Sequence, residues 1–290
     1  MKKNFLYSFL VVLLGLLLGA CSEQTTETTT PKKEELTDTT ENEATESDAE
    51  ENEATESNTA PDSEWSYDEE TGPDHWGDLD PTYSACTDGN EQSPINIETS
   101  EVNTNEKLEN IEIHYEPTEF SIVNNGYTVQ ANPATENNII VLDGKEYKLA
   151  QFHFHTPSEH QFDGKQLDME LHLVHQDANG ELAVLGLMIK EGKENESLAP
   201  IWGVLPNQKT ESDIAVEDTV DLQSLLPSDQ TTFNYNGSLT TPPCTEEVKW
   251  IVFEEPIEMS KEQIQAYQQI FHDNDRPVQP LNDREVFEVK

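Results

Sequence analysis

The chain has 290 residues, enough for one large domain or two small ones. Its formal net charge of −43 excludes a nucleic-acid binder and attachment to anionic lipid through a polybasic surface. Hydrophobic residues make up only 34% of the chain, and the deficit is uneven, so we expect a disordered segment beside an ordinary folded domain.

The N-terminus is typical of an exported protein. Lys2 and Lys3 precede an apolar run of 16 residues, which is shorter than a membrane-spanning helix and typical of a secretory signal. The run ends in Leu18-Gly19-Ala20-Cys21, which resembles the lipobox of bacterial lipoproteins. The resemblance implies a signal peptide at 1–20, a diacylated Cys21 and a protein lipid-anchored outside the cytoplasm, on the bacterial cell membrane. A plain signal peptide with an incidental cysteine is the alternative.

Residues 21–64 are predicted to form an acidic, disordered tether. The segment is rich in Thr, Glu, Ser and Asn, and residues 41–47 recur as residues 51–57. It has almost no large apolar side chains, so little would offset the entropy lost on ordering. A partner-binding acidic tail is the less favoured alternative, because the repeat lacks aromatic anchors. The folded domain is predicted at 65–290, where aromatic residues reappear.

Most of this domain is predicted to be β-structure. Short runs of β-branched, aromatic and alternating residues recur, and turn dipeptides such as Asp143-Gly144 and Asn179-Gly180 separate many of them. We expect strands at 111–115, 120–123, 127–131, 139–142, 147–155, 169–175, 182–189 and 250–253. The predicted fold class is mainly β: a single domain with a central, largely antiparallel twisted sheet and short peripheral helices.

One helix is predicted after the last of these strands. Ser260 and Gln263 form a capping-box pattern. Ile264, Tyr267 and Phe271 follow at helical spacing.

The strand predicted at 147–155 carries two histidines on one face. Side chains alternate between the two faces of a strand, so Gln151, His153 and His155 share a face and the intervening phenylalanines occupy the other. Two imidazoles about 7 Å apart along a strand can converge on one ion.

The strand predicted at 169–175 supplies a third candidate ligand. Glu170 and His172 share a face, whereas His175 falls on the opposite face. An antiparallel neighbour would place His172 beside the first two histidines, and three neutral nitrogen ligands suit Zn²⁺. Gln151 and Glu170 each precede a histidine by two residues and can accept its remaining N–H. A single His-x-His pair can equally be surface or core histidines, so both strands are needed for this interpretation.

Taken in order, short motifs across the folded region resemble those of the α-class carbonic anhydrases. They lie at residues 65–67, 72–77, 92–97, 151–155, 158–160, 170–175, 182–186, 238–244, 250–252 and 276–282. The resemblance implies the α-carbonic-anhydrase fold and reversible hydration of CO₂ to bicarbonate and a proton by zinc-bound hydroxide.

The resemblance also implies a role for each matched residue. The implied zinc ligands are His153, His155 and His172. The implied partners of these ligands are Gln151, Glu170 and the backbone carbonyl of Asn274. The implied catalytic groups are Glu159 and Thr240, as a hydrogen-bond relay to the hydroxide, and Tyr67, which would hold ordered water. The implied CO₂ pocket is lined by Val174, Val184, Leu239, Thr241 and Trp250. The implied disulfide joins Cys86 and Cys244, with two unpaired buried thiols as the alternative.

One position departs from this resemblance. Many efficient members carry a proton-shuttling histidine after an Asn-Asn-Gly turn, whereas here the residue that follows 124–126 is Tyr127. A phenol with a pKa near 10 exchanges protons poorly at neutral pH. Tyr127 is therefore a weak shuttle position, or an aromatic residue that only packs, and His75 and His160 are the other candidate shuttles.

Together these observations predict a zinc-dependent carbonic anhydrase, a lyase that acts on CO₂ and bicarbonate at the outer surface of a bacterial membrane. The alternative is a non-catalytic zinc-binding or surface-interaction protein on the same scaffold. The sequence leaves open whether the protein is a monomer or a homodimer.

Overall fold

The computed structural model describes residues 64–104 and 111–290. The predicted signal peptide, Cys21 and nearly all of the predicted tether lie outside the described residues, so the domain boundary after residue 64 stays a prediction. Within the two described stretches, no helix is both long enough and apolar enough to cross a membrane.

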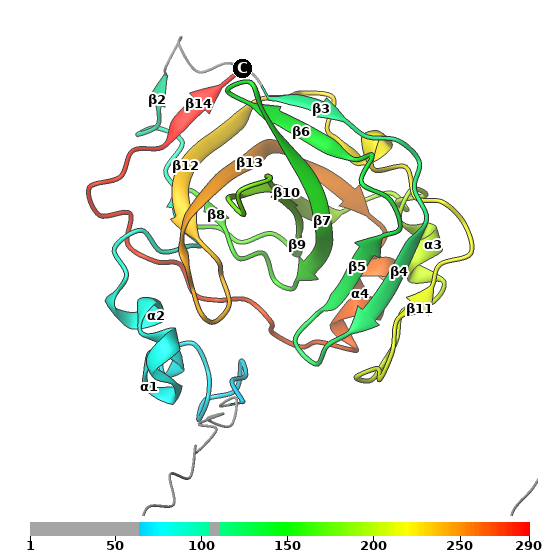
Figure 1. The fold of residues 1–290 in the computed structure, drawn as a ribbon, viewed down its shortest axis with the longest axis horizontal. Helices are drawn as coiled ribbons and strands as arrows, with labels where there is room; N and C mark the ends of the chain where they lie inside the picture. Colours follow the sequence, from blue (N-terminus) through cyan, green and yellow to red (C-terminus); the bar gives the residue numbers. More distant parts are fainter. Residues whose placement is uncertain (1–63, 105–110) are drawn as a thin grey trace, which may run out of the picture. The chain divides into compact units, whose positions relative to one another are not determined.

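Strands dominate the described part of the chain (Figure 1). The strands are β1 (Asn96–Ile97), β2 (Asn103–Thr104), β3 (Glu112–His114), β4 (Phe120–Asn124), β5 (Val129–Pro133), β6 (Ile139–Leu142), β7 (Lys145–His155), β8 (Gln161–Phe162), β9 (Met169–Gln176), β10 (Leu182–Glu191), β11 (Ile214–Ala215), β12 (Thr232–Ser238), β13 (Glu246–Met259) and β14 (Phe287–Val289). The helices are α1 (Trp76–Leu79), α2 (Ala85–Asp88), α3 (Ala199–Trp202) and α4 (Lys261–Gln268), with 3-10 turns η1 (Pro81–Tyr83) and η2 (Leu222–Leu225).

Twelve of the strands form one twisted sheet, with β7, β9, β10 and β13 as its central strands (Figure 1). The strand order is β11-β4-β5-β7-β9-β10-β13-β12-β14-β2, and β3 and β6 branch from β7. Pairing within this sheet is antiparallel except between β10 and β13 and between β14 and β2, and the remaining strands, β1 and β8, form a separate parallel pair. The prediction of a mainly β, largely antiparallel sheet with short helices is therefore confirmed.

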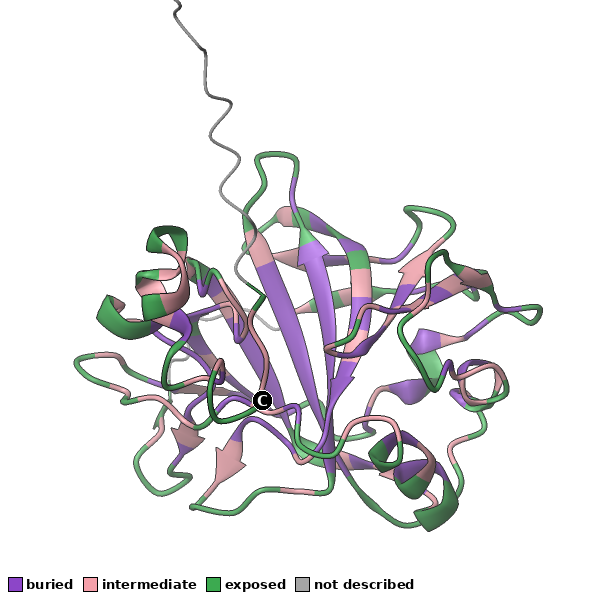
Figure 2. Cartoon of the chain, turned by 90° about the horizontal axis from the view of Figure 1, so that it is seen from below, coloured by how far each residue is buried: buried purple, intermediate pink, exposed green. Residues whose placement is uncertain are grey.

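β9 and β10 are buried along most of their length, whereas the loops and helices carry most of the exposed residues (Figure 2). One face of the sheet packs on a large cluster that includes Phe152, Phe154, Leu171 and Leu173. A smaller cluster on the other face includes Val174 and Trp250, and the Trp250 ring contacts the ring of His172. The alternation of apolar and polar residues in β7 and β9 thus separates a hydrophobic core from a polar site.

Some predicted elements have different bounds in the structure. Tyr127 precedes β5, whose first residue is Val129, because Asn125 Oδ1 accepts from the backbone N–H groups of Tyr127 and Thr128 and holds both in the preceding turn. The strand predicted at 250–253 is the middle of the much longer β13. The predicted helix has both capping-box hydrogen bonds but is shorter than predicted, since Phe271 lies after α4.

Candidate metal centre

The pairing of β7 with β9 brings three histidines together. His153 and His172 are direct cross-strand partners, and His155 is two residues farther along β7 on the same face. One nitrogen atom from each of the three imidazoles lies within 4.8 Å of the other two. The three nitrogen atoms therefore converge on a single point, as a metal ion requires.

On each imidazole, the ring nitrogen that faces away from the other two histidines donates its N–H to a fixed acceptor. His153 Nδ1 lies 2.8 Å from Gln151 Oε1, and His155 Nδ1 lies 2.6 Å from the Asn274 backbone oxygen. His172 Nε2 lies 2.9 Å from a carboxylate oxygen of Glu170. The nitrogen atoms left over are Nε2 of His153, Nε2 of His155 and Nδ1 of His172. His155 Nε2 is fully buried and has no hydrogen-bond partner among the described residues, which fits a metal-binding atom.

Burial favours the neutral imidazoles that metal binding requires. It lowers the pKa of His155 to about 4 and the pKa of His153 well below its usual range. Burial also lowers the pKa of His172, although the Glu170 carboxylate opposes that shift. At neutral pH all three histidines are therefore uncharged, with a lone pair available on the inward nitrogen.

Glu159 and Thr240 lie beside the triad. Glu159 is completely buried, its Oε1 atom accepts from the Arg276 backbone N–H at 2.8 Å, and Oε2 lies 3.9 Å from His172 Nδ1. Burial raises the pKa of Glu159 to about 7, and the Thr240 hydroxyl lowers it as a hydrogen-bond donor. Oε2 has no hydrogen-bond partner of good geometry in the described part of the chain, so this oxygen is available to the Thr240 hydroxyl.

The loop that carries Thr240 joins β12 to β13 and is held at several points. The Leu239 backbone N–H donates to the Thr245 oxygen at 2.9 Å, which closes the loop across its base. A disulfide links Cys244 to Cys86 of α2, as the resemblance implied. Gln92 Nε2 donates to the Cys244 oxygen at 3.0 Å. These contacts restrict the backbone of the loop and so fix the position of the Thr240 hydroxyl.

The Cys86–Cys244 disulfide is expected to stabilise the folded domain. Replacing Cys86 and Cys244 together with Ser should lower the free energy of unfolding by about 3–5 kcal/mol, because the bond closes a loop of 158 residues. Urea unfolding with and without reductant measures the difference, and the double variant should not respond to reductant. Equal unfolding midpoints for reduced and oxidised wild-type protein would contradict the prediction.

The residues expected to line an apolar pocket gather next to the triad. Val174, Val184, Leu239 and Trp250 belong to one hydrophobic cluster, and the Trp250 ring centroid lies 4.8 Å from that of His172. This apolar surface adjoins the point where the three imidazoles converge. Thr241, also assigned to the pocket, is half-buried next to Thr240.

The two tyrosines assigned near the site are held by aromatic contacts. Tyr67 packs edge-on against Trp65 and Trp76, and its buried hydroxyl has no hydrogen-bond partner in residues 64–104 or 111–290. Tyr127 stacks on Trp65 with ring centroids 3.8 Å apart, and burial raises the pKa of its phenol further. The Tyr127 side chain therefore packs, and it is an even poorer proton carrier than a free phenol.

The two alternative shuttle histidines occupy very different places. His75 is exposed at the start of α1. His160 is completely buried, with hydrogen bonds at both ring nitrogens, to Glu170 and to Tyr235. A shuttle must exchange protons with solvent, so the interpretation of His160 as a shuttle was wrong.

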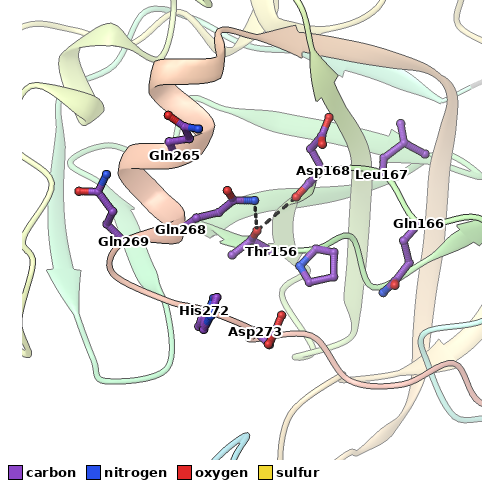
Figure 3. Close-up of a pocket in the computed structure, with 10 residues that line it drawn as sticks. Thr156, Gln166, Leu167, Asp168, Gln265, Gln268, Gln269, His272 and Asp273 are labelled. Atoms are coloured by element: carbon purple, nitrogen blue, oxygen red, sulfur yellow. Dashed lines mark hydrogen bonds between the residues drawn. The ribbon is translucent and has the colours of Figure 1, made fainter.

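Helix α4 supports the end of β7 behind the triad, next to a polar cavity of about 920 Å³ (Figure 3). The Tyr267 hydroxyl donates to the Phe154 oxygen at 2.8 Å, and Gln268 Nε2 donates to Thr156 Oγ1 at 3.3 Å. Thr156 directly follows His155. The helix therefore helps to hold the chain that positions His155.

The sequence interpretation assigned no role to Arg276. Its guanidinium group is buried and donates to Gln92 Oε1, to the Ser93 oxygen and to the Cys86 oxygen, at 2.8–2.9 Å. Its backbone N–H holds Glu159. Arg276 thus links the N-terminal part of the domain to Glu159 beside the three histidines. Its only signal in the sequence was its place in one matched motif.

The fold and the three convergent histidines define a metalloenzyme-like site on a β-sheet scaffold, and known proteins identify the family. Residues 71–290 match the family described as eukaryotic-type carbonic anhydrase. A carbonic anhydrase of Klebsiella pneumoniae is 42% identical over 228 residues, which cover 78% of this chain and 91% of that protein.

Solved structures agree with this family match. The α-carbonic anhydrase of Thermovibrio ammonificans, solved with the inhibitor sulfanilamide, matches with a TM-score of 0.75 and 43% sequence identity. The match covers 78% of this chain and 99% of that chain. A hyperthermostable carbonic anhydrase from an active hydrothermal vent chimney has a TM-score of 0.74 and 44% identity, with 78% and 100% covered. The chain belongs to the α-carbonic anhydrase family and is an enzyme of that family.

Proposed function

We propose that this chain catalyses the reversible hydration of CO₂ to bicarbonate and a proton, with zinc held by His153, His155 and His172. The observation that carries the proposal is the convergence of three neutral imidazole nitrogens whose opposite nitrogens all have fixed partners. When bound, zinc acts as a Lewis acid that lowers the pKa of a coordinated water to about 7 and so makes a strong nucleophile available at neutral pH.

The chain's own residues orient the reactants. A hydroxyl has one proton, so if Thr240 donates it to Glu159, the Thr240 oxygen can only accept a hydrogen bond from the attacking group. That arrangement would direct a lone pair of the nucleophile toward the carbon of CO₂. The apolar surface of Val184 and Trp250 suits uncharged CO₂ and offers no hydrogen bond to bicarbonate, which favours release of the charged product.

The proposal is tested by zinc analysis combined with stopped-flow CO₂ hydration. We expect one zinc per chain and hydration that disappears when the metal is removed and returns when zinc is added. A folded, zinc-loaded protein without CO₂ hydration activity would contradict the proposal and favour a non-catalytic zinc-binding protein.

Proton transfer sets a second expectation. Without an imidazole at position 127, regeneration of the nucleophile should depend on buffer, so kcat should rise with the concentration of an imidazole-type buffer. Tyr127→His should raise kcat in dilute buffer by as much as about 100-fold and leave kcat/KM nearly unchanged, because that ratio reports attack on CO₂. Stopped-flow measurements across buffer concentrations provide the test.

Tyr127→Phe is the matched control for this experiment. It keeps a ring that can stack on Trp65 and removes only the hydroxyl. We expect wild-type kcat at every buffer concentration. A large loss of kcat in Tyr127→Phe would show instead that the phenol carries the proton.

We also propose that the enzyme acts at the outer surface of a bacterial membrane, anchored by lipid on Cys21. The support is the basic and apolar N-terminus that ends in a lipobox-like motif, followed by an acidic segment that can hold the domain away from the surface. A disulfide in the folded domain is consistent with an oxidising compartment.

Mass spectrometry of the membrane-bound protein should show a mature chain that begins at Cys21 and carries, on its sulfur, one lipid group that bears two acyl chains. Cys21→Ser should prevent attachment of the lipid, because the thiol that carries it is gone. The protein should then leave the membrane fraction, since it lacks the acyl chains that hold it there. An unmodified Cys21 in membrane-bound wild-type protein would contradict the anchor.

A further inference from the structure

A continuous chain of buried polar groups leads away from the metal centre, starting at His172. One oxygen of Glu170, Oε1, accepts from His172 Nε2 at 2.9 Å and from His160 Nδ1 at 2.8 Å. The Tyr235 hydroxyl lies 2.7 Å from His160 Nε2 and 2.8 Å from Ser93 Oγ. All five side chains are buried.

The number of available protons determines the direction of each hydrogen bond in this chain. An ionised Glu170 can only accept, and its Oε2 atom already accepts from two backbone N–H groups, at 159–160. His160 therefore donates from Nδ1, and neutral His160 accepts the Tyr235 hydroxyl proton at Nε2. The Ser93 hydroxyl then donates to the Tyr235 oxygen. If His160 were cationic, the bonds from His160 to Tyr235 and from Tyr235 to Ser93 would reverse, and the Ser93 proton would lose its acceptor in this chain.

Two glycines, on the strands either side of β13, leave the space that these groups occupy. A Cβ atom on Gly186 of β10 would lie 3.0 Å from Glu170 Oε1. A Cβ atom on Gly237 of β12 would lie 2.1 Å from Ser93 Oγ and 2.8 Å from Tyr235 Cε2. A side chain at either position would therefore displace the hydrogen-bonded groups.

We propose that Ser93, Tyr235 and His160 are positioning residues that hold Glu170 against His172 and thereby set how long the site retains its metal. Each hydrogen bond restricts rotation of the next group, so the Glu170 carboxylate keeps the His172 ring turned with Nδ1 toward the other two histidines. His160, Glu170 and His172 are also close enough to be read as a metal-binding group, but the hydrogen bonds already use their facing atoms. This inference rests on the proposed zinc site.

The test is the rate at which zinc-loaded protein loses zinc to an excess of chelator. Tyr235→Phe keeps the ring and removes the hydroxyl, so His160 Nε2 loses its donor and Glu170 is held less firmly. We expect zinc to leave about 10-fold faster than from wild type. Ser93→Ala should have a smaller effect, because Tyr235 can still donate to His160.

Tyr115→Phe is the matched control. The Tyr115 hydroxyl lies 2.8 Å from Nε2 of His175, so the chain contains a second buried Tyr–His pair of the same chemistry. His175 lies on β9 but on the opposite face from His172. Its partner Tyr115 belongs to the large hydrophobic cluster, so this pair has no connection to the three histidines. We expect Tyr115→Phe to release zinc at the wild-type rate even if it lowers stability.

A spectroscopic measurement tests the hydrogen-bond directions without any variant. Nitrogen-15 NMR of the zinc-loaded wild type should show neutral His160 with its proton on Nδ1. A cationic His160, one protonated at Nε2, wild-type zinc release from Tyr235→Phe, or equal acceleration in Tyr235→Phe and Tyr115→Phe would overturn the inference. Wild-type protein that fails to hold zinc would instead overturn the proposed function.

Discussion

His172→Ala is expected to weaken zinc binding by at least about 100-fold, because it removes one of the three proposed protein ligands and leaves Glu170 without its imidazole partner. CO₂ hydration at limiting zinc should fall in proportion. Zinc content after dialysis, together with stopped-flow hydration, measures both effects. Stoichiometric zinc and full activity in the variant would show that His172 is not a ligand.

His175→Ala separates loss of a ligand from loss of stability. His175 lies on the same strand as His172 but points into the core, where it contacts Tyr115. Truncation of this buried side chain should destabilise the fold by creating a cavity. The remaining folded protein should still bind one zinc.

Thr240→Ala is expected to lower kcat/KM for CO₂ by about 100-fold while zinc content stays unchanged, because the attacking group loses the acceptor that orients it. Thr240→Ser keeps the hydroxyl and should retain most of the activity. Thr245→Ala is the control on the same loop, since Thr245 is exposed and contributes its backbone oxygen to the contact with Leu239. A Thr240→Ala enzyme with wild-type kcat/KM would eliminate the hydroxyl from the reaction.

Distant parts of the chain hold the Thr240 loop and Glu159 in place. The disulfide, Gln92 and Arg276 connect the segment around α2 to the Thr240 loop and to Glu159. The site therefore depends on the N-terminal part of the folded domain, although none of the three convergent histidines comes from it. Variants there should affect activity through position rather than through direct contact with CO₂.

Local sequence pattern predicted much of the fold and most of the candidate site. Alternation in β7 and β9 predicted which side chains share a face, because the two-residue repeat of a strand is a local property. The turn dipeptide at 143–144 marked the connection between β6 and β7 for the same reason. The family resemblance then implied which residues meet, and the structure places the three histidines within reach of one ion.

Strand ends and six of the fourteen strands were not predicted, because pairing partners override local preference. The missed strands are β1, β2, β8, β11, β12 and β14. β12 was missed, since Asn234, Asn236 and Gly237 are poor strand formers, yet it pairs with β13 along its length. β13 continues through Pro256, which interrupts a local strand pattern but is accommodated in this long strand.

By itself, the sequence determined the strand faces, the capping box, the candidate ligands and, through resemblance, the family, because these depend on neighbouring residues or on matched motifs. Only the tertiary structure decided that Tyr127 stacks on Trp65 and that His160 is buried between Glu170 and Tyr235. The physical reason is that the burial and hydrogen-bond partners of a side chain are set by segments far away in the chain. The two histidines considered as proton shuttles look alike in sequence, and only packing distinguishes the exposed His75 from the buried His160.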